Sequence, residues 1–454
     1  MIGGERIFEV LKQVLDRSPA EQTELVYIGG RDELTRYTGS QIHQNVAETN
    51  SKIFIRVAEG RRLGVVTANA LEVEALLKAA EQALELARHQ PENKYFDGFA
   101  PPAEYDQTRT YFEATAQFTP RQRAEAVKRI FAEAEKLGFE VSGAFTTGEG
   151  ELAILNSNGV EAYQPLTHAE LRIVPVSKEG MSYASAFAHD VTKLDIEGTA
   201  ARALERCSLN KNQQEIPLGQ YDVILEPGCL AEVMTWLSFI AFGSNAYIEG
   251  TSFLAGKLGE RSMGENVTIY DSIHEPEAEG IPFDFEGTPK RKLMLIERGV
   301  NRGVAFDRVS AKQAGMEPTG HAGPPGSPWG AIPWNICMAP GDSSVEEMIA
   351  GCERGLLITR FHYLNGFLNP KEALMTGMTR YGTFLIEDGK IKHAVKNLRW
   401  TESMLRAFSN VEAISRAREV IPLGKGGAAF SILPAVYIKG FTFTGVQESE
   451  MAES

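Results

Sequence analysis

The sequence predicts an α+β protein in which an N-terminal α/β domain of strands and two long helices precedes a mainly β C-terminal domain with helical insertions. Strand-like segments separated by glycine turns recur in both halves of the chain, and two segments of the first half have a helical period. A polar stretch at 208–219 separates the halves, and the length of 454 residues fits two or three domains. We therefore expect domains at 1–210 and 220–446, and a polar tail at 447–454.

The N-terminal half is expected to begin with an amphipathic helix in residues 1–18 and to continue as strands at 24–30, 40–50, 52–60 and 62–68. Residues 71–90 then form a helix, because apolar residues recur on one face and Pro91 lies just beyond its end. Further along, Asn158-Gly159 predicts a hairpin turn between two strands.

The second long helix has clear boundaries in the sequence. Thr119 and Gln122 form a capping box, Pro120 suits the first turn, and Gly138 ends the helix. The helical period predicts a buried stripe made of Val127, Ile130, Phe131, Ala134 and Leu137.

The C-terminal half is expected to be mostly strands with two helical insertions. The first is CLAEVMTWLSFIAF at 229–242, where Glu232 is the only charge. The second begins with a capping box at Ser343 or Ser344 and ends at Gly355. Asp388-Gly389 predicts a hairpin. The Gly/Pro-rich segment from 318 to 333 is a loop, and loops of that length are usually functional or mobile.

Composition excludes several classes of function. The net charge of −14 argues against a nucleic-acid partner, because phosphate contacts require a basic face. The four cysteines form no C-x-x-C pair, which favours the reducing cytoplasm, and residues 1–18 lack the pattern of a signal peptide. A bilayer span needs about 20 apolar residues, so the run at 229–242 is a buried helix and no membrane association is expected.

Candidate chemical groups are few. The eight histidines include no pair with the spacing of a helical zinc site. Asp284 and Glu286 would share one face of a strand, and paired carboxylates can serve a metal or acid–base chemistry. We favour the simpler interpretation, a solvated strand end that leads into a turn at Gly287.

His321 and Trp329 of the Gly/Pro-rich segment, and Trp334 just beyond it, have two interpretations each. His321 could be a metal ligand or a base, although a hydrogen bond to a backbone carbonyl is the commoner case. Trp329 and Trp334 could contact a peptide or a partner, although packing that anchors the loop is the safer expectation. Residue chemistry alone therefore identifies no catalytic site.

Several stretches nevertheless resemble the TldD/PmbA peptidase family, and the resemblance covers residues 20–446. The matching stretches are EGTSFLAGKLGE at 249–260, PFDFEGTPKRKLMLIERGV at 282–300, AGMEPTGHAG at 314–323, PGDSSVEEMIAGCERGLLIT at 340–359 and FLIEDGKI at 384–391. The active members of that family carry H-E-x-x-x-H on a helix before the G-T-S stretch, and a cysteine near the C-terminus completes their zinc site.

This chain departs from that pattern. An ungapped placement puts Thr235 and Ile240 where the two zinc-binding histidines would stand, and Trp236 where the glutamate base would stand. The segment REVIPLGKGGAAFSILP at 418–434 also lacks the cysteine. Because zinc needs donor atoms, the resemblance implies that this chain has no catalytic residues and binds no metal by the family site.

The pattern is similar to the TldE (PmbA) branch of the family, which lacks the metal motif and pairs with a zinc-bearing TldD subunit. The resemblance implies a non-catalytic subunit, inactive alone, of a two-chain zinc metalloprotease that processes unfolded or short peptides in the cytoplasm. It also implies a heterodimer with a TldD-like homologue, or a homodimer when the chain is alone. The alternatives are a stand-alone peptide-binding or escort protein, and a diverged metallohydrolase that uses Asp284, Glu286 and His321.

Overall fold

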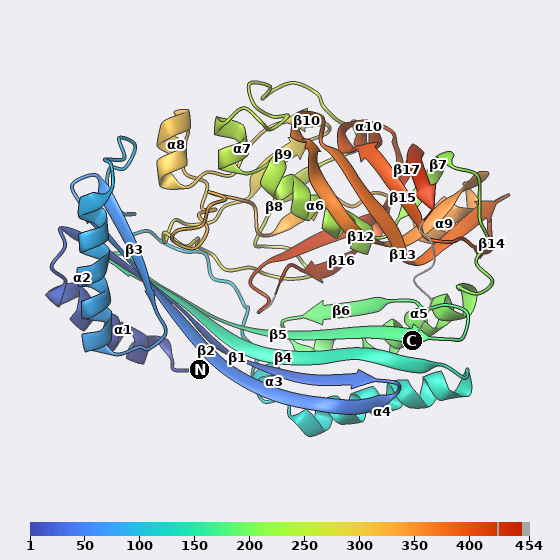
Figure 1. The fold of residues 1–454 in the computed structure, drawn as a ribbon, viewed down its shortest axis with the longest axis horizontal. Coiled ribbons are helices and arrows are strands. Elements are labelled where there is room, and N and C mark those ends of the chain that lie inside the picture. The colour runs from blue at the N-terminus through green and yellow to red at the C-terminus, as the bar shows by residue number, and fades with distance from the viewer. Residues whose placement is uncertain (425, 447–454) are drawn as a thin grey trace.

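Two β-sheets, one from each half of the chain, form the framework of the protein (Figure 1). The computed structural model describes residues 1–424 and 426–446. The first half contains strands β1 (Gln22–Thr38), β2 (Gln41–Glu59), β3 (Arg62–Ala68), β4 (Glu140–Asn156), β5 (Glu161–Val176) and β6 (Ala184–Ala188). Its helices are α1 (Gly4–Arg17), α2 (Val73–His89), α3 (Glu113–Ala116), α4 (Pro120–Lys136) and α5 (Ile196–Leu209).

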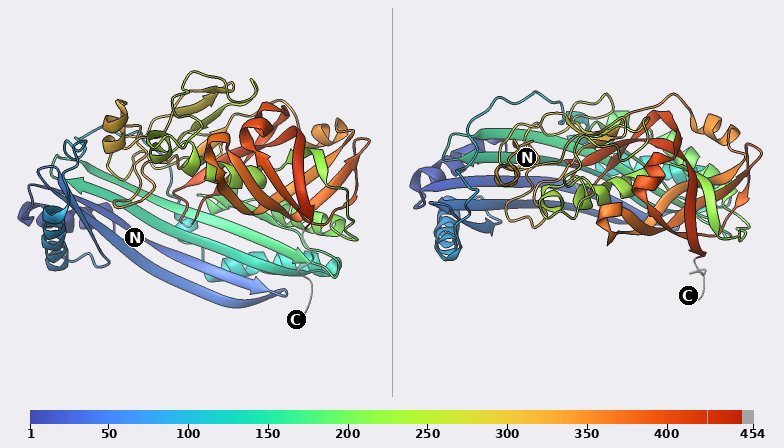
Figure 2. Two further views of the ribbon diagram at one scale, coloured as in Figure 1. Left: turned by 45° about the horizontal axis from the view of Figure 1, so that its top comes forward. Right: turned by 90° about the horizontal axis from the view of Figure 1, so that it is seen from above.

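The first sheet is antiparallel, long and curved, with the strand order β3-β2-β1-β4-β5-β6. Helices cover only one of its faces. Alternate residues such as Leu25 and Tyr27 pack under α1 and α2, while Tyr37 and Phe145 pack under α4 and α5. The opposite face is turned toward the C-terminal half, as the two views in Figure 2 show.

The predicted boundaries of the N-terminal half are largely confirmed. Helix α4 begins at Pro120 with the expected capping box of Thr119 and Gln122, and the Asn158-Gly159 turn joins β4 to β5. The strands expected at 40–50 and 52–60 are instead one strand, β2, which pairs with β1 without a break between them. Leu137 is 50% exposed rather than buried, because it is the C-cap residue that follows the last turn of the helix, just before the chain enters β4.

The second half contains strands β7 (Gly219–Leu225), β8 (Ile269–Asp271), β9 (Leu293–Glu297), β10 (Val300–Asn301), β11 (Ile336–Met338), β12 (Arg354–Asn369), β13 (Leu374–Glu387), β14 (Lys390–Ala394), β15 (Leu398–Ser403), β16 (Val411–Pro422) and β17 (Phe430–Val446). Its helices are α6 (Pro227–Ile240), α7 (Ser244–Ile248), α8 (Arg308–Ala314), α9 (Val345–Ala350) and α10 (Met404–Ser409). The sheet is mixed, since β12 and β7 are parallel while β12 and β13 are antiparallel. Pairing of β17 with β7 closes a ring through β15, β13 and β12.

The C-terminal half contains more helices than the two insertions expected, since α7, α8 and α10 are also present in the described residues. Ser344 caps α9 as predicted, but the helix ends at Gly351. Gly355 lies in β12, where a side chain would collide with the backbone of β7. The Asp388-Gly389 turn between β13 and β14 is confirmed, with φ of 50° and 72°. The segment 318–333 contains neither helix nor strand, as expected.

The two halves meet through an apolar cluster. Val26, Phe54 and Ile154 of the first sheet pack against Ile281 and Phe283 of the second half. The division at 210 and 220 remains a prediction, and the predicted tail at 447–454 lies outside the described residues.

Candidate functional site

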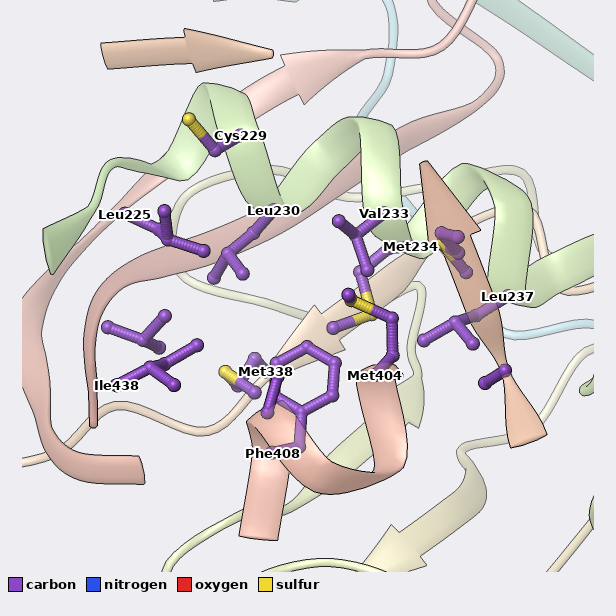
Figure 3. Packing of buried hydrophobic residues seen from close by; sticks show 14 of the residues in the cluster. Leu225, Cys229, Leu230, Val233, Met234, Leu237, Met338, Met404, Phe408 and Ile438 are labelled. Atoms are coloured by element: carbon purple, nitrogen blue, oxygen red, sulfur yellow. The ribbon is translucent and has the colours of Figure 1, made fainter. Parts of the chain in front are cut away.

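Helix α6 forms one wall of the candidate site. Its apolar side chains point into the core of the C-terminal half, where Leu230 and Leu237 meet Met404 and Phe408 (Figure 3). This packing explains the apolar run predicted at 229–242. Among the described residues, no helix is long and apolar enough to cross a membrane.

The opposite face of α6 lines a cavity of about 520 Å³ between the two halves of the chain. Ala231, Thr235 and Ser238 face it at helical spacing. The other walls are the edge of the first sheet, the loop before β11, and the end of β16. They contribute Glu170, Arg172, Tyr183, Ser185, Ile332, Pro333, Trp334, Arg360, Ile421, Pro422, Leu423 and Gly424.

The three residues aligned with the family motif lie on different sides of α6. Thr235 lines the cavity, and its hydroxyl donates to the Ala231 carbonyl at 2.8 Å. Trp236 and Ile240 pack instead against Gly366 of β12. The Trp236 ring is half-buried and meets the Phe367 ring edge-on, with 5.0 Å between centroids.

Charged residues border the cavity in pairs. Arg172 donates two hydrogen bonds to the carboxylate of Glu170, at 2.5 and 2.9 Å. The Arg360 guanidinium lies 4.1 Å from the centre of the Tyr183 ring and 3.8 Å from the Glu232 carboxylate. Burial raises the pKa of Glu232, and Arg360 opposes that shift. The cavity therefore offers both signs of charge beside apolar surface.

Two further hollows, of about 380 and 310 Å³, continue along the open face of the first sheet. The 380 Å³ hollow shares Glu170, Arg172, Pro422 and Gly424 with the cavity at α6. The two hollows share Asp32, His168 and Gly426 with each other. Together the three spaces trace one cleft between the sheet and the segment that joins β16 to β17.

A histidine–carboxylate contact lies in this cleft. His168 of β5 is buried, and its Nε2 atom is 3.1 Å from Oδ1 of Asp32 on β1. A side chain at Gly427 would collide with His168, so the segment after β16 passes close to the sheet here. The cleft floor is therefore polar where the chain crosses over it.

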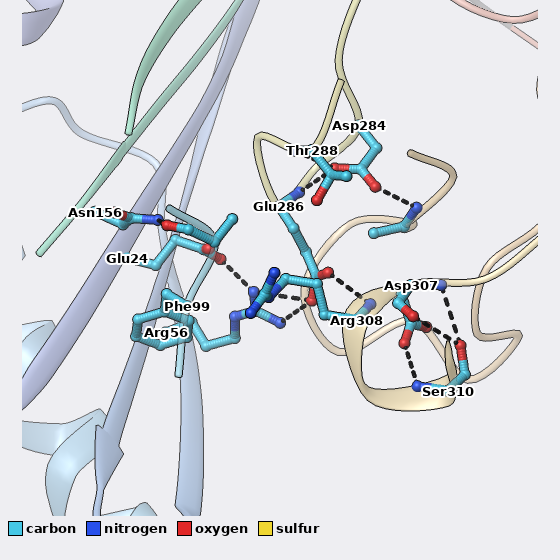
Figure 4. A network of polar contacts seen from close by, with 12 residues as sticks. Glu24, Arg56, Phe99, Asn156, Asp284, Glu286, Thr288, Asp307, Arg308 and Ser310 are labelled. Atoms are coloured by element: carbon cyan, nitrogen blue, oxygen red, sulfur yellow. Dashed lines mark hydrogen bonds and ion pairs between the residues drawn. The ribbon is translucent and has the colours of Figure 1, made fainter. Parts of the chain in front are cut away.

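Asp284 and Glu286 are buried rather than solvated, and they lie in a turn rather than on one strand face. Asp284 accepts backbone N–H bonds from Glu286, Thr288 and Ala322 at 2.8–2.9 Å. Glu286 accepts from both terminal nitrogens of Arg56 on β2, at 3.2 and 3.3 Å, as Figure 4 shows. The favoured interpretation as a solvated strand end is therefore wrong, because these carboxylates satisfy buried donors from the turn and from the other sheet.

His321 is fully buried and holds the Gly/Pro-rich segment through side chains rather than through a backbone carbonyl. Its Nδ1 atom is 2.9 Å from the Thr319 hydroxyl, and its Nε2 atom is 3.1 Å from Asp271. The Asp271 carboxylate also accepts the backbone N–H groups of Trp334 and Asn335. Burial would raise the pKa of Asp271, but the His321 ring and these donors lower it to about 2.

The two tryptophans of this region have different surroundings. Trp334 is half-buried and lines the cavity at α6. Trp329 is 47% exposed, with its ring centre 4.9 Å from that of Phe239 on α6. The Trp329 ring therefore packs against Phe239 and also presents aromatic surface to solvent.

The residues at the cavity do not fit a zinc ion. Of the α6 residues that line the space, Ala231, Thr235 and Ser238 supply no imidazole, thiolate or carboxylate, and the carboxylate of Glu232 lies 3.8 Å from Arg360. Across residues 1–424 and 426–446, no group of three or more His, Cys, Asp or Glu side chains is placed to hold a metal. No hydrolytic step through a metal on this chain follows from these positions.

Sequence reasoning missed the residues that the first sheet contributes to the cleft. Asp32, His168, Glu170 and Arg172 alternate along β1 and β5, so their side chains share the open sheet face. Polar residues at every second position of a strand are the signal that could have indicated this surface.

Comparison with protein families covers most of the chain. Residues 218–445 match the PmbA/TldA metallopeptidase C-terminal domain, residues 23–87 match domain 1, and residues 116–210 match the central domain. The chain belongs to the PmbA/TldD metallopeptidase family.

Individual relatives are distant. The chain is 26% identical over 310 residues to a metalloprotease of Methanothermobacter thermautotrophicus. The matched stretch covers 62% of this chain and 65% of that protein. It is 22% identical to the metalloprotease PmbA of Escherichia coli O157:H7, over 95% of this chain and 97% of that one. A relative in Saccharolobus solfataricus, 24% identical over 55% of this chain and 57% of its own length, is named a zinc metalloprotease TldD homolog.

Solved structures have the same fold. TldE of Thermococcus kodakarensis superposes with a TM-score of 0.87 at 22% identity, over 96% of this chain and all of that one. A Thermotoga maritima protein described as a putative modulator of a DNA gyrase superposes with a TM-score of 0.83 at 21% identity, over 97% and 99% of the two chains.

Proposed function

We propose that this chain is the non-catalytic, TldE (PmbA)-like subunit of a two-chain zinc metalloprotease that processes unfolded or short peptides. The zinc belongs to a TldD-like partner with the H-E-x-x-x-H motif. The observation that carries the proposal is the face of α6, which presents Ala231, Thr235 and Ser238 to the cavity, while its one carboxylate there, Glu232, lies beside Arg360. The likeness to TldE over nearly the whole chain supports it.

The cleft supports a role in holding peptide. Its three connected spaces run along the open face of the first sheet, and β6 is the last strand of that sheet. Ser185 of β6 lines the cavity. An extended peptide can bind a strand edge through main-chain hydrogen bonds, which suits substrates of varied sequence.

An exposed aromatic surface beside α6 supports a protein partner. Tyr363 and Phe367 of β12 are 74% and 54% exposed, and Leu368 is 45% exposed. Phe367 contacts Trp236, and Trp329 contacts Phe239, so the exposed residues of β12 and the exposed Trp329 both lie against α6. We call Trp329, Tyr363, Phe367 and Leu368 the aromatic surface. Exposed apolar groups of this kind commonly mark interfaces, in which aromatic residues are enriched.

The cytoplasm is the compartment we propose for the complex. The four cysteines are buried and unpaired with one another, which suits a reducing environment.

The proposal is tested by reconstitution with a zinc-bearing homologue from the same organism. Zinc is measured by elemental analysis, and cleavage is followed with a fluorogenic unfolded peptide. We expect the chain alone to hold no stoichiometric zinc and to cleave nothing, and the mixture to hold one zinc per pair and to cleave the peptide. A partner whose motif glutamate is replaced by glutamine is the matched control, since it should pair and bind zinc without cleavage.

The alternatives predict different results. One equivalent of zinc together with cleavage by the chain alone would support the diverged metallohydrolase. Peptide binding without any complex, at every accessible concentration, would support the escort protein. The contacts of Asp284, Glu286 and His321 weigh against the metallohydrolase, because all three side chains already bind protein groups.

A further inference from the structure

Arg360, which lines the cavity, faces a second arginine across neighbouring strands. Arg360 of β12 and Arg380 of β13 are direct partners in the antiparallel register, so their side chains leave the sheet on the same face. Like charges directly opposite each other destabilise a sheet unless another group compensates them. The overall net charge of −14 makes an uncompensated cationic pair unusual for this chain.

Neither arginine is well neutralised. The carboxylate paired with Arg360 is that of Glu232, and it lies 3.8 Å away, beyond hydrogen-bond distance. Arg380 donates to the Nε2 atom of His362 at 2.6 Å, and it forms no ion pair within residues 1–424 and 426–446. An imidazole ring carries no negative charge, so His362 does not offset the charge of the guanidinium. Arg172, which lines the same cavity, instead forms a bidentate pair with the carboxylate of Glu170.

Aromatic rings hold both guanidinium groups in place. The Arg360 guanidinium lies 4.1 Å from the centre of the Tyr183 ring, and the Tyr183 ring stacks on Tyr381 with 5.7 Å between centroids. Arg380 lies 4.9 Å from the same Tyr381 ring. Tyr381 has φ of 64°, a left-handed conformation that a tyrosine rarely adopts, and the register of β12 and β13 shifts beside it. Bulges of this kind re-aim side chains next to functional sites.

We propose that Arg360 and Arg380 form a subsite that binds a carboxylate of the peptide held in the cleft. This inference rests on the proposed peptide-binding role and adds the chemistry that the cavity selects. A guanidinium can donate two parallel hydrogen bonds to one carboxylate. Aromatic rings that fix the guanidinium beforehand reduce the conformational entropy lost on binding. The carboxylate is either the C-terminal group of the peptide or an Asp or Glu side chain.

Fluorescence anisotropy of three labelled peptides on the isolated chain tests the subsite. They are an unfolded decapeptide of Gly, Ser and Ala with a free C-terminal carboxylate, the same peptide as its amide, and the amide with one internal glutamate. We expect the free acid to bind about tenfold more tightly than the amide, as for a hydrogen-bonded ion pair. If the amidated peptide with an internal glutamate binds like the free acid, a side-chain carboxylate is sufficient for binding at the subsite. If this peptide binds like the plain amide, the subsite requires the C-terminal carboxylate.

Variants assign the effect to the two arginines. Arg360→Gln and Arg380→Gln should each remove most of the preference for the carboxylate while leaving the affinity for the plain amide unchanged. Arg380→Lys should restore part of the preference, and Arg399→Gln, at an exposed position of β15, should leave it intact. Each variant is checked for the melting temperature of the parent, so that loss of fold is separated from loss of the subsite.

Three results would overturn the subsite. They are equal affinity for all three peptides, an equal loss for acid and amide in the glutamine variants, and no binding of any peptide by the chain. None of them decides whether the chain forms an active complex with a zinc-bearing partner, which zinc content and cleavage measure separately.

Discussion

Replacing Glu24 by glutamine should remove a pH dependence of stability that arises where the two halves meet. Glu24 is fully buried on β1, and its carboxylate lies 2.7 Å from Arg56, which it shares with Glu286. The contact is close but poorly aligned, because neither Glu24 oxygen receives a well-directed hydrogen bond from the described residues. Burial therefore raises the pKa of Glu24 from 4.5 to about 7, in spite of the attraction of Arg56.

The sign and size of the effect follow from this shift. Between pH 4.5 and 7 the folded protein holds the Glu24 proton more tightly than the unfolded chain does. The contribution of Glu24 to stability therefore falls as pH rises through that window. Each pKa unit corresponds to about 1.4 kcal/mol, so the full loss is about 3 kcal/mol.

Urea unfolding followed by tryptophan fluorescence, repeated across this pH window, measures the difference between parent and Glu24→Gln. We expect the parent to lose about 3 kcal/mol more than the variant as pH rises, because glutamine cannot ionise. Glu161→Gln, at an exposed position of β5, is the control and should follow the parent curve. Parallel curves for parent and Glu24→Gln would show that folding leaves the pKa of Glu24 unchanged, and the reasoning from burial would fail.

Two other substitutions test the surroundings of α6. Trp236→Ala should lower the free energy of unfolding by about 2 kcal/mol, less than a fully buried tryptophan would lose, because the ring is half-buried against Gly366. Urea unfolding checks this value, and a variant as stable as the parent would contradict the packing. Tyr363→Ser combined with Phe367→Ser should weaken binding to a zinc-bearing partner at least tenfold. Stability should fall by only about 1 kcal/mol, because both rings are exposed and the loss is that of the edge-on contact with Trp236. Sedimentation of the mixture measures this binding, and unchanged affinity would place the partner elsewhere.

Local signals in the sequence predicted local structure well. The capping box of Thr119 and Gln122 and the Asp388-Gly389 turn depend on a few neighbouring residues, and both are present. The length of β2 was missed because it depends on continuous pairing with β1, a partner strand whose register the sequence does not reveal.

The site was harder to predict because its partners are distant in the chain. Glu286 is satisfied by Arg56, 230 positions earlier, so inspection of its neighbours suggested a solvated residue. The cavity likewise combines Arg172, Tyr183 and Arg360 from elements on both sides of the predicted domain boundary. The burial of the helix at 229–242 was predictable, because its residues form one continuous apolar run in the sequence.

Closure of the strand ring has a consequence for how the chain acquires its structure during synthesis. β7 opens the C-terminal half, yet it pairs with β17, which ends at Val446, some 220 residues later. The ribosome must therefore synthesise the chain through β17 before β7, β11 and β16 can all pair with it. Until then the backbone donors and acceptors on the edges that pair with β17 are open to other chains. Nascent chains halted before Phe430 should consequently be protease-sensitive and prone to aggregate, whereas the first sheet, complete at Ala188, can form much earlier.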